Sequence, residues 1–496
     1  MSRTFPAWWL PPGVPERASP AATEVPPHAG GAEHPGTAPP AFSTASLSDD
    51  LRLRFPTPDP AFARRLCDHL VEAGARLHER RTDSLVASLG RAGARFLDPA
   101  DPIRKEALDL LPAAAGLSAA MAREVLDGMA RDWTADRLAR LVRAQFPDPA
   151  VLDGFRRRPG GSRVRAFGHR LIVQLGAGNV AGVSVGGLAR ALLARSPVLL
   201  KPGLHDALLP VLYARALADC DPGLAAALAV LYWPGGADTM EAEVLSRAGL
   251  VVVYGGVDTV ATVRTRLPAT TPLVAYSHRV GVALVGREAL VTGRADRTAM
   301  DAARAVAAFD QRGCVSPHLF WVEEGGALAP AEWAARLAAA MAALEQDLPA
   351  GPAPPEVASN VQQLRGTWEL KQAAGEGARV FRPAGAEWTV VYDPDPAFSP
   401  SCLGRFAWVK PVPDLERVAG LLAGLRPFLQ TAGLCGAGAR AASLVEQLGA
   451  AGVTRVASLR RMAWPPAWWH HDGGDPLRAL VRWVDWEVEQ EPRAQG

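Results

Sequence analysis

The feature that most constrains the fold is an alternation of short apolar runs and helical stretches in the middle of the chain. The apolar runs are LIVQLG (171–176), Val198–Leu200 and Leu250–Gly256. The stretches between them, to Arg195 and to about Leu231, have helical character. Short strands that alternate with helices indicate βαβ crossovers and a parallel sheet. We therefore expect an α/β fold.

A second alternating set follows and predicts a second lobe. It consists of a strand over Val280–Val285, a helix over Thr298–Asp310 and a strand over His318–Val322. Further strands are expected in Arg379–Val391 and Phe406–Val412. No internal repeat is found, so the two lobes are not copies of one unit.

The amino-terminal part of the chain has a different character. Its first 45 residues are rich in Pro, Ala, Gly and Ser and lack a hydrophobic period, which predicts a disordered tail. Trp8 and Trp9 are expected to be exposed, and the alternative is that they dock on the folded part of the chain. The region after this tail has apolar residues at helical spacing. The expected division is a tail (1–45), a helical region (46–165), a cofactor lobe (166–278), a catalytic lobe (279–465) and a carboxyl-terminal segment (466–496).

Composition excludes several classes of function. The chain has 53 Lys+Arg against 51 Asp+Glu, a net charge of +2, which gives no electrostatic reason to expect nucleic acid or anionic membrane as a partner. No apolar run approaches the ~18–20 residues of a membrane span, and no signal peptide is recognised. The five cysteines include no CxxC pair, so neither a disulfide framework nor a metal site is expected. A cytoplasmic location fits this pattern.

The turn after LIVQLG partly matches a dinucleotide fingerprint. Gly176 and Gly178 occupy the first two positions of GxGxxG, but the third is Ala181. Dinucleotide-binding sites usually have an acidic residue at the end of the next strand, where it binds the adenosine ribose, but here that strand ends in Lys201. A cation at this position suits a ribose or a 2′-phosphate. We expect Gly178 and Lys201 to bind a cofactor. The alternative is a glycine turn that only lets a helix approach the sheet.

Cys314 is the candidate nucleophile. In FDQRGCVSPH it follows a predicted helix and Gly313, and precedes a Ser-Pro pair that stops a helix. A cysteine at such a junction is exposed near backbone N–H groups, conditions that lower a thiol pKa and stabilise an oxyanion. The alternative is a small buried side chain, as most free cysteines are. The other four cysteines look structural.

Three further motifs are not expected to be catalytic. His318 follows Cys314 closely, but Pro317 and the start of a strand direct its side chain elsewhere. Ser184 stands in a GxSxG string yet lies inside a predicted helix rather than at a nucleophile elbow. The cluster His470–Asp472 is expected to be a solvated or interface loop, not a metal site.

The order of the motifs resembles that of the aldehyde dehydrogenase superfamily. The similarity is greatest to its acyl-CoA reductase branch, the reductase subunit of bacterial bioluminescence fatty-acid reductase complexes, and it covers roughly Leu47 to Glu489. The motifs that carry it are GAGNVAGVSVGGLARALL, VLLKPG, the YGG of 254–256, SHRVGVALV, QRGCVSP, FLQTAG and HHDG…LVRWVDWE.

This resemblance implies a variant Rossmann lobe, a catalytic lobe and a strand-mediated dimer contact, the last in 466–496. It makes Cys314 the nucleophile and Asn179 an oxyanion donor, together with the Cys314 backbone N–H. It places Lys201 at the adenosine ribose, and Gly255 and Gly256 along the cofactor.

Two departures from the superfamily point to reduction. Aldehyde-oxidising members carry a glutamate that activates water, and the matching stretch Tyr276–Gly281 has no carboxylate. The Glu-x-Phe-Gly segment that holds the nicotinamide ribose is replaced near Ser401–Gly404. His278 either lines the site in place of the glutamate or is a surface residue at the start of a strand.

The resulting hypothesis is NADPH-dependent reduction of a fatty acyl-CoA to the aldehyde through an acyl-cysteine, with NADH as the second choice of cofactor. The expected partners are the acyl-CoA substrate, an acyl-transferase or acyl-protein synthetase, and a second copy of the chain. The alternatives are an oxidative NAD-dependent aldehyde dehydrogenase and a non-catalytic scaffold of an acyl-transfer complex. A product assay separates the first, and thiol labelling the second.

Overall fold

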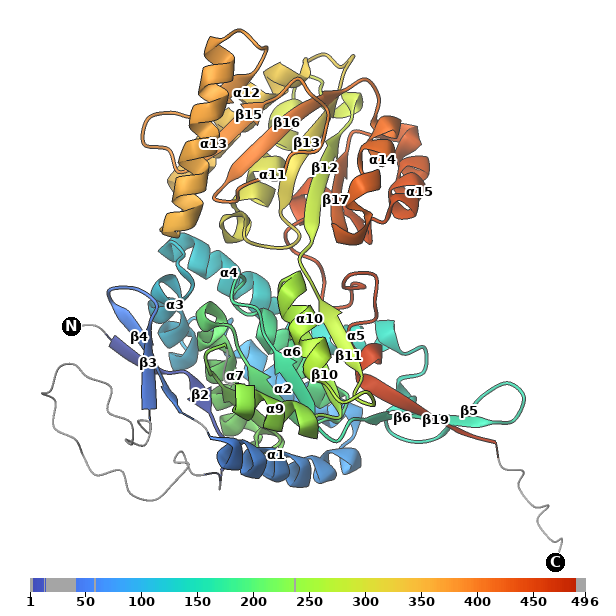
Figure 1. The fold of residues 1–496 in the computed structure, drawn as a ribbon. Helices are drawn as coiled ribbons and strands as arrows, with labels where there is room; N and C mark the ends of the chain where they lie inside the picture. Colours follow the sequence, from blue (N-terminus) through green and yellow to red (C-terminus); the bar gives the residue numbers. More distant parts are fainter. Residues whose placement is uncertain (1–2, 13, 15–41, 58, 236–237, 488–496) are drawn as a thin grey trace, which may run out of the picture. The chain divides into compact units, whose positions relative to one another are not determined.

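The computed structural model describes residues 3–12, 14, 42–57, 59–235 and 238–487. Its contacts divide the chain into two compact units (Figure 1). The first unit comprises Met1–Leu110, Met129–Tyr276 and Asp475–Gly496, and the second comprises Leu111–Gly128 and Ser277–Gly474.

A six-stranded sheet forms the centre of the first unit, in the order β11-β10-β7-β8-β9-β2. The strands are parallel except β2, which runs antiparallel to β9. Their bounds are β2 (Trp8–Trp9), β7 (Ile172–Leu175), β8 (Val198–Lys201), β9 (Leu228–Leu231), β10 (Leu250–Tyr254) and β11 (Leu273–Tyr276).

Helices cover both faces of this sheet. One buried cluster joins Leu66 and Val244 to Val173, while Gln174, the next residue along β7, touches the opposite helix at Gly187. This alternation is what a strand buried on both faces requires. The helices are α1 (Pro60–Ala75), α2 (Thr82–Ala94), α5 (Ala135–Gln145), α6 (Val183–Leu193), α7 (Leu208–Cys220), α8 (Pro222–Ala225), α9 (Asp238–Arg247) and α10 (Val257–Arg266). Two more, α3 (Pro102–Ala115) and α4 (Ala119–Arg131), each have residues in both units.

The helix expected to reach Leu231 is shorter, and the prediction was wrong there. Asp221 ends α7, and its carboxylate accepts the Leu224 N–H at 3.0 Å to cap the short α8. The strand β9 follows, buried at every position. A fully buried strand lacks the two-residue alternation, so its apolar run reads like the end of a helix.

The amino-terminal residues are ordered where the structure describes them. The strand β1 (Arg3–Pro6) pairs with β4 (Leu51–Pro56), which also pairs with β3 (Phe42–Ser46). Trp8 packs against the core of the first unit, and its ring lies 5.4 Å from that of Phe42. The expectation of a disordered tail is therefore wrong for residues 3–9, because a strand edge and an apolar surface offset the loss of chain entropy. Residues 15–41 lie outside the described residues.

A third sheet in the first unit is made from distant parts of the chain. The strand β6 (Arg163–Gly168) pairs antiparallel with both β5 (Arg156–Arg157) and β19 (Val481–Trp486) (Figure 1). The carboxyl-terminal segment in which we expect a dimer contact thus contributes β19 to this sheet.

A seven-stranded sheet forms the centre of the second unit, in the order β14-β15-β16-β13-β12-β17-β18. It is parallel except for β14. The strands are β12 (Val280–Val285), β13 (Pro317–Glu323), β14 (Arg379–Phe381), β15 (Thr389–Tyr392), β16 (Phe406–Val412), β17 (Leu429–Cys435) and β18 (Arg455–Ala457).

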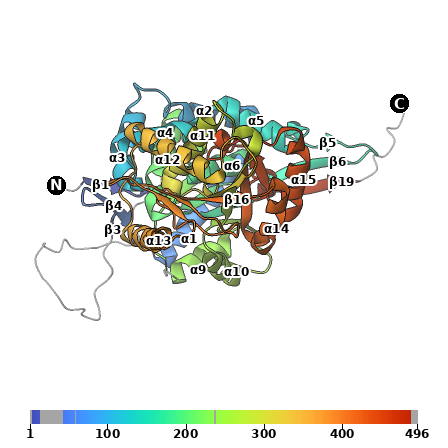
Figure 2. The same ribbon diagram turned by 90° about the horizontal axis from the view of Figure 1, so that it is seen from above.

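The helices of the second unit pack on the two faces of its sheet. Trp321 of β13 belongs to a cluster that includes side chains of α13, α14 and α15, whereas Phe320 contacts Trp333 of α12. These helices are α11 (Ala295–Ala307), α12 (Pro330–Asp347), α13 (Pro355–Ala373), α14 (Val418–Leu421) and α15 (Ala441–Ala451), seen from above in Figure 2. In the described parts of the chain, no helix combines the length and apolarity that a bilayer crossing needs.

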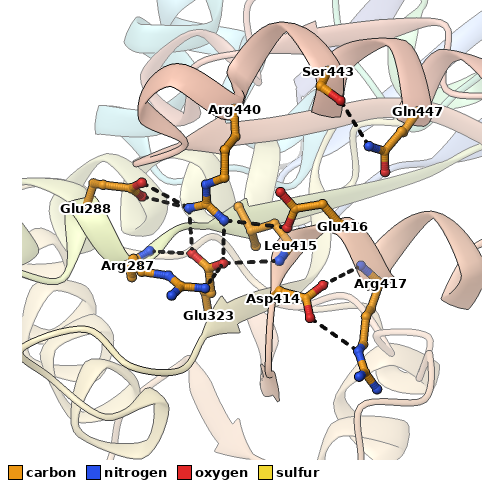
Figure 3. A network of polar contacts seen from close by, with 10 residues as sticks. All are labelled: Arg287, Glu288, Glu323, Asp414, Leu415, Glu416, Arg417, Arg440, Ser443 and Gln447. Atoms are coloured by element: carbon orange, nitrogen blue, oxygen red, sulfur yellow. Dashed lines mark hydrogen bonds and ion pairs between the residues drawn. The ribbon is translucent and has the colours of Figure 1, made fainter.

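A polar network closes the carboxyl edge of this second sheet (Figure 3). Glu323, buried at the end of β13, accepts hydrogen bonds from Arg440 (2.6 Å), Arg287 (2.8 Å) and the Leu415 N–H (3.3 Å). Although burial opposes ionisation, the two arginines hold the pKa of Glu323 well below its usual range. The network ties three loops together at this edge.

Replacing Trp8 with Ala should lower the free energy of unfolding by about 2 kcal/mol, because it removes a half-buried indole from the core surface. The matched control is Leu370→Ala, since Leu370 is 73% exposed and should change little. Urea unfolding followed by circular dichroism measures both variants. Equal stability of the Trp8 variant and the parent would show that β2 is not docked in solution.

Candidate active site

The residues expected to bind a cofactor gather at one edge of the first sheet. Leu175, at the end of β7, lies in register with Lys201 of β8 and with Val253 of β10. The turns that follow these strands carry Gly178–Asn179 and Gly255–Gly256. In open α/β sheets this carboxyl edge is where ligands bind.

Two of these turns touch through their backbones. A Cβ atom added to Gly203 would lie 2.3 Å from the Gly178 nitrogen, so only glycine fits there. Asn179 follows in the same turn and is exposed. Gly203 and Gly178 therefore have a packing role, which is independent of the cofactor role expected of Gly178.

The amino terminus of α6 is occupied by a carboxylate of the chain itself. Asp206 accepts hydrogen bonds from the Gly182 N–H (2.6 Å) and the Ser184 N–H (3.1 Å). Burial raises the pKa of Asp206 to about 7. A cofactor phosphate would need these same N–H groups in a standard Rossmann site, so the partial GxGxxG match does not make α6 a phosphate site. Ser184 itself is buried in the first turn of α6.

The amino terminus of α10 is open by comparison. Its cap residue is Gly256, no side chain caps the helix, and a Cβ atom on Gly256 would meet nothing within 4 Å. Its first N–H groups suit a phosphate.

Lys201 stands at the same edge in a partly buried setting. Its ammonium lies about 6 Å from the rings of Tyr232 and Trp233, and burial lowers its pKa while Glu241 opposes this. Within the described residues, it makes no hydrogen bond or ion pair that would compete with a ligand. Glu241 was not recognised in the sequence. It lies in α9 and is held by the indole of Trp233 (3.1 Å) and by Arg266 (3.2 Å).

In the second unit, Cys314 lies in the turn that leads into β13. The turn is closed by a hydrogen bond from the Ser316 N–H to the Gly313 carbonyl (2.9 Å), and the cysteine is partly buried. It therefore lies at the amino edge of the second sheet, opposite to the edge closed by Glu323.

An unusual backbone precedes this cysteine turn. Residues 309–311 have φ values of 54°, 51° and 64°, and a second run at 403–405 has 67°, 63° and 58°. Only one of these six residues is a glycine, Gly404. Left-handed conformations are costly for other residues and persist only where surrounding contacts impose them.

Buried polar side chains impose these conformations by joining the two runs. Arg405 donates to Asp310 at 2.9 Å, and Gln311 exchanges hydrogen bonds of 2.8 Å with both backbone groups of Phe406. The hydroxyl of Ser401 also donates to the Phe406 carbonyl at 2.6 Å. The segment Ser401–Gly404, where the ribose-binding Glu-x-Phe-Gly motif is expected to be replaced, thus helps to fasten the cysteine loop to the sheet.

The thiol of Cys314 has a raised pKa, contrary to the sequence expectation. Burial raises it to about 11, and the Asp472 carboxylate contributes in the same direction. A hydrogen bond from Gln430 and the charge of Arg279 act in the opposite sense. Burial outweighs the nearby cation, so the thiol is protonated at neutral pH.

The loop expected to be solvated instead supplies a buried acid beside this thiol. Asp472 is 7% exposed, and its two oxygens accept hydrogen bonds from Arg279 (2.8 Å) and Gln430 (2.6 Å). His471 stacks on Trp469. Among the residues that the structure describes, no cluster suited to a metal ion is found. The prediction is wrong for Asp472, because this residue meets its partners only through the fold, whereas His470 is exposed as expected of a solvated loop.

The histidines His318 and His278 lie in different surroundings. His318 accepts the Ser401 N–H at its Nδ1 (3.1 Å), and burial together with the charge of His278 lowers its pKa to about 4. His278 is exposed at the start of β12. Cys314 and His278 thus belong to the second unit, while Asn179 and the cofactor residues belong to the first.

Because Asp472 and Arg279 form an ion pair beside the thiol, we expect substitutions of these two residues to change the reactivity of Cys314 in opposite directions. Asp472→Asn should lower the pKa of Cys314 and speed its alkylation at pH 8, by up to about tenfold for each pKa unit, while Arg279→Gln should slow it. Asn tolerates the left-handed backbone of residue 472 (φ 54°). Iodoacetamide labelling read by peptide mass spectrometry measures both rates.

The control for this test is Glu446→Gln, an exposed acid, which should label like the parent. Mere loosening of the site would speed labelling in both variants. A common direction of change would therefore contradict the electrostatic account.

The link between the two left-handed runs predicts a large stability effect. Arg405→Lys keeps the charge but loses the hydrogen bonds that Arg405 makes to Asp310 and to the Leu348 carbonyl, and should lower the free energy of unfolding by about 3 kcal/mol. Arg417→Lys, at a residue whose side chain is 68% exposed, should change it by less than about 0.5 kcal/mol. Urea unfolding followed by tryptophan fluorescence compares them, and equal midpoints would refute the role of Arg405.

The solved structures to which this fold is similar include aldehyde dehydrogenases. Aldehyde dehydrogenase 21 from Physcomitrella patens superposes with a TM-score of 0.71 over 91% of this chain and 96% of its own, at 14% identity. NADP-dependent glyceraldehyde-3-phosphate dehydrogenase from Bacillus halodurans gives 0.68 over 90% and 95%, also at 14% identity. These similarities concern the fold, and they confirm the expected aldehyde-dehydrogenase-like α/β class.

Sequence comparison is more specific. A Vibrio harveyi protein named long-chain acyl-protein thioester reductase is 28% identical over 160 residues, which spans 32% of this chain and only about a third (33%) of that protein. The family described as acyl-CoA reductase (LuxC) matches residues 77–483. This match includes both strand-end turns of the first sheet and the cysteine turn of the second, and the chain therefore belongs to the acyl-CoA reductase (LuxC) family.

Proposed function

We propose that this protein reduces an acyl thioester to the aldehyde through an acyl intermediate on Cys314. The observation that carries the proposal is the state of Asp472, the carboxylate whose charge acts on the Cys314 thiol. Both oxygens of Asp472 are bound, by Arg279 and Gln430, and Tyr276–Gly281 supplies no other acid. Because the Asp472 carboxylate is already engaged, it is poorly placed to activate water, which favours an acyl-enzyme that survives until it is reduced.

In the proposed reaction, the residues of the chain act in two stages. The thiolate of Cys314 attacks the thioester carbonyl, and the donor's thiolate leaves as the acyl-cysteine forms. The Cys314 N–H and the Asn179 amide are the proposed donors to the oxyanion of each tetrahedral state. A bound reduced nicotinamide would supply the hydride, after which the C–S bond breaks, the aldehyde leaves and Cys314 departs as thiolate.

The raised pKa of the thiol adds a requirement. Because Cys314 is protonated in the free protein, its proton must leave before attack. Substrate binding that shields Asp472 from the thiol, or brings a cation closer, would favour the thiolate.

The first unit offers a fitting place for a nicotinamide dinucleotide. The open end of α10 suits its phosphates, and Lys201 suits an adenosine ribose or its 2′-phosphate. Glu241 is engaged by Trp233 and Arg266, which favours the lysine as the group that reads this ribose. We therefore propose NADPH as the preferred cofactor, with NADH as the competitor in the test.

The proposed donor is a fatty acyl-CoA. The name of the Vibrio harveyi relative points to a second donor class, an acyl group carried on a protein. An acyl-transferase or acyl-protein synthetase would then be a partner. We also propose a homo-oligomer and a cytoplasmic location.

Turnover assays separate this proposal from an oxidative dehydrogenase. The parent protein should oxidise NADPH only when an acyl-CoA is present, with one aldehyde formed per NADPH. Cys314→Ala should abolish the reaction, and Asn179→Ala should lower turnover by ~10²–10³ with unchanged circular dichroism, since one oxyanion donor is lost. Absorbance at the nicotinamide band and aldehyde trapping measure the two products.

Production of NADH from NAD and an aldehyde, without thioester reduction, would instead establish the oxidative reaction. A parent protein that neither acylates Cys314 nor oxidises NADPH with acyl-CoA or acyl-protein donors would be the scaffold. Slow thiol labelling alone does not discriminate here, because a buried thiol of raised pKa labels slowly in either case.

A further inference from the structure

A pocket beside the cysteine loop has no role in the chemistry described so far. It has a volume of about 110 Å³ and lies between the start of α13, the hairpin joining β14 to β15, and the left-handed run at 403–405. Asp310 and Arg312 form part of its wall. Since Arg312 is two residues from Cys314, their Cα atoms are within about 7 Å of each other.

The charges of the pocket wall are unbalanced. Four arginines and two acids line it. Asp310 is shared by Arg405 and Arg312. Of the remaining charged residues in the wall, Arg365 and Arg382 are positive and only Glu387 is negative, so the pocket has an excess of positive charge.

Arg365 is the least usual of these groups. It is 4% exposed, and its Nε and Nη2 both donate to one neutral atom, Thr389 Oγ1, at 3.1 and 2.8 Å. Its Nη1 has only a 3.5 Å contact with Gln362. No carboxylate of the described chain forms an ion pair with it, although Glu369 and Glu387 are near enough to influence its pKa. A buried guanidinium without a counter-ion is costly, and an anionic ligand removes that cost.

The start of α13 contributes in the same direction. Its cap residue is Pro354, which has no side-chain group to accept the first N–H groups, and Val357 of the first turn lines the pocket. The positive end of a 19-residue helix and two arginines therefore face one small space. Val361 and Leu403 make another part of the wall apolar, so the anion is expected to belong to a larger molecule.

We propose that this pocket binds the phosphate of a phosphopantetheine arm on the acyl donor. This inference rests on the proposed function and adds the recognition of the donor to it. The volume holds a few waters, and so a phosphate or diphosphate rather than a whole nucleotide. Coenzyme A and a carrier protein both present this phosphate, and both also carry the thioester that Cys314 would attack.

The test replaces the exposed arginine of the pair, because a change at buried Arg365 threatens folding. Arg382→Glu should raise KM for the phosphate-bearing donor about tenfold, as expected for a lost charge-assisted contact, and leave kcat within twofold. It should not change KM for the matching acyl-pantetheine, which lacks phosphate, or for NADPH. The matched control is Arg379→Gln, an exposed arginine of β14 outside the pocket wall, which should behave as the parent.

Two donors identify the source of the phosphate. An effect with acyl-CoA alone assigns the pocket to coenzyme A, and an effect with acyl-carrier protein alone assigns it to the carrier. Equal KM values of parent and Arg382→Glu for both donors, or a rise in KM for NADPH instead, would overturn the proposal.

A binding measurement keeps this result separate from the proposed function. Calorimetry of Cys314→Ala with coenzyme A, 4′-phosphopantetheine and pantetheine requires no turnover. Phosphate-dependent binding that Arg382→Glu weakens about tenfold would support the proposal that the pocket binds phosphate, even if no donor were reduced. Failure to reduce any donor would count only against the proposed reductase activity. Reduction of acyl-CoA without phosphate-dependent binding would support the proposed reductase activity and contradict the proposal that the pocket binds phosphate.

Discussion

The buried contact between Asp310 and Arg405 is the interaction on which the second unit depends. It holds two segments almost a hundred residues apart in left-handed conformations that neither would keep alone. One segment leads directly into the cysteine turn, and the other leads into β16. Because Gln311 adds hydrogen bonds to Phe406, the loop bearing Cys314 is fixed to the sheet rather than free to move.

The two sheets use their edges differently. In the first unit the carboxyl edge carries the glycine turns and Lys201, as is usual for open parallel sheets. In the second unit the carboxyl edge is closed by the network around Glu323, and the cysteine lies at the amino edge. A single architecture, a parallel sheet between helices, therefore serves cofactor binding at one edge and covalent chemistry at the other, in the function proposed here.

Much of this could be predicted from local sequence, and the failures share one cause. The strand β12 and the residues around Cys314 follow from apolar runs and from Gly and Pro positions, which act over a few residues. Asp206, Glu241 and Asp472 were missed or misjudged because their importance comes from partners 24, 8 and 193 residues away, which only the fold brings to them. The raised pKa of the thiol has the same origin, since burial is a property of the folded chain. No periodicity records such contacts.

The protonated state of Cys314 also bears on how the protein survives between catalytic cycles. Peroxide attacks thiolates, and the first oxidation product of a cysteine leads on to irreversible acids. A thiol with a pKa of about 11 exposes almost no thiolate at neutral pH. The burial that keeps the proposed nucleophile protonated at rest therefore also shields it from oxidation.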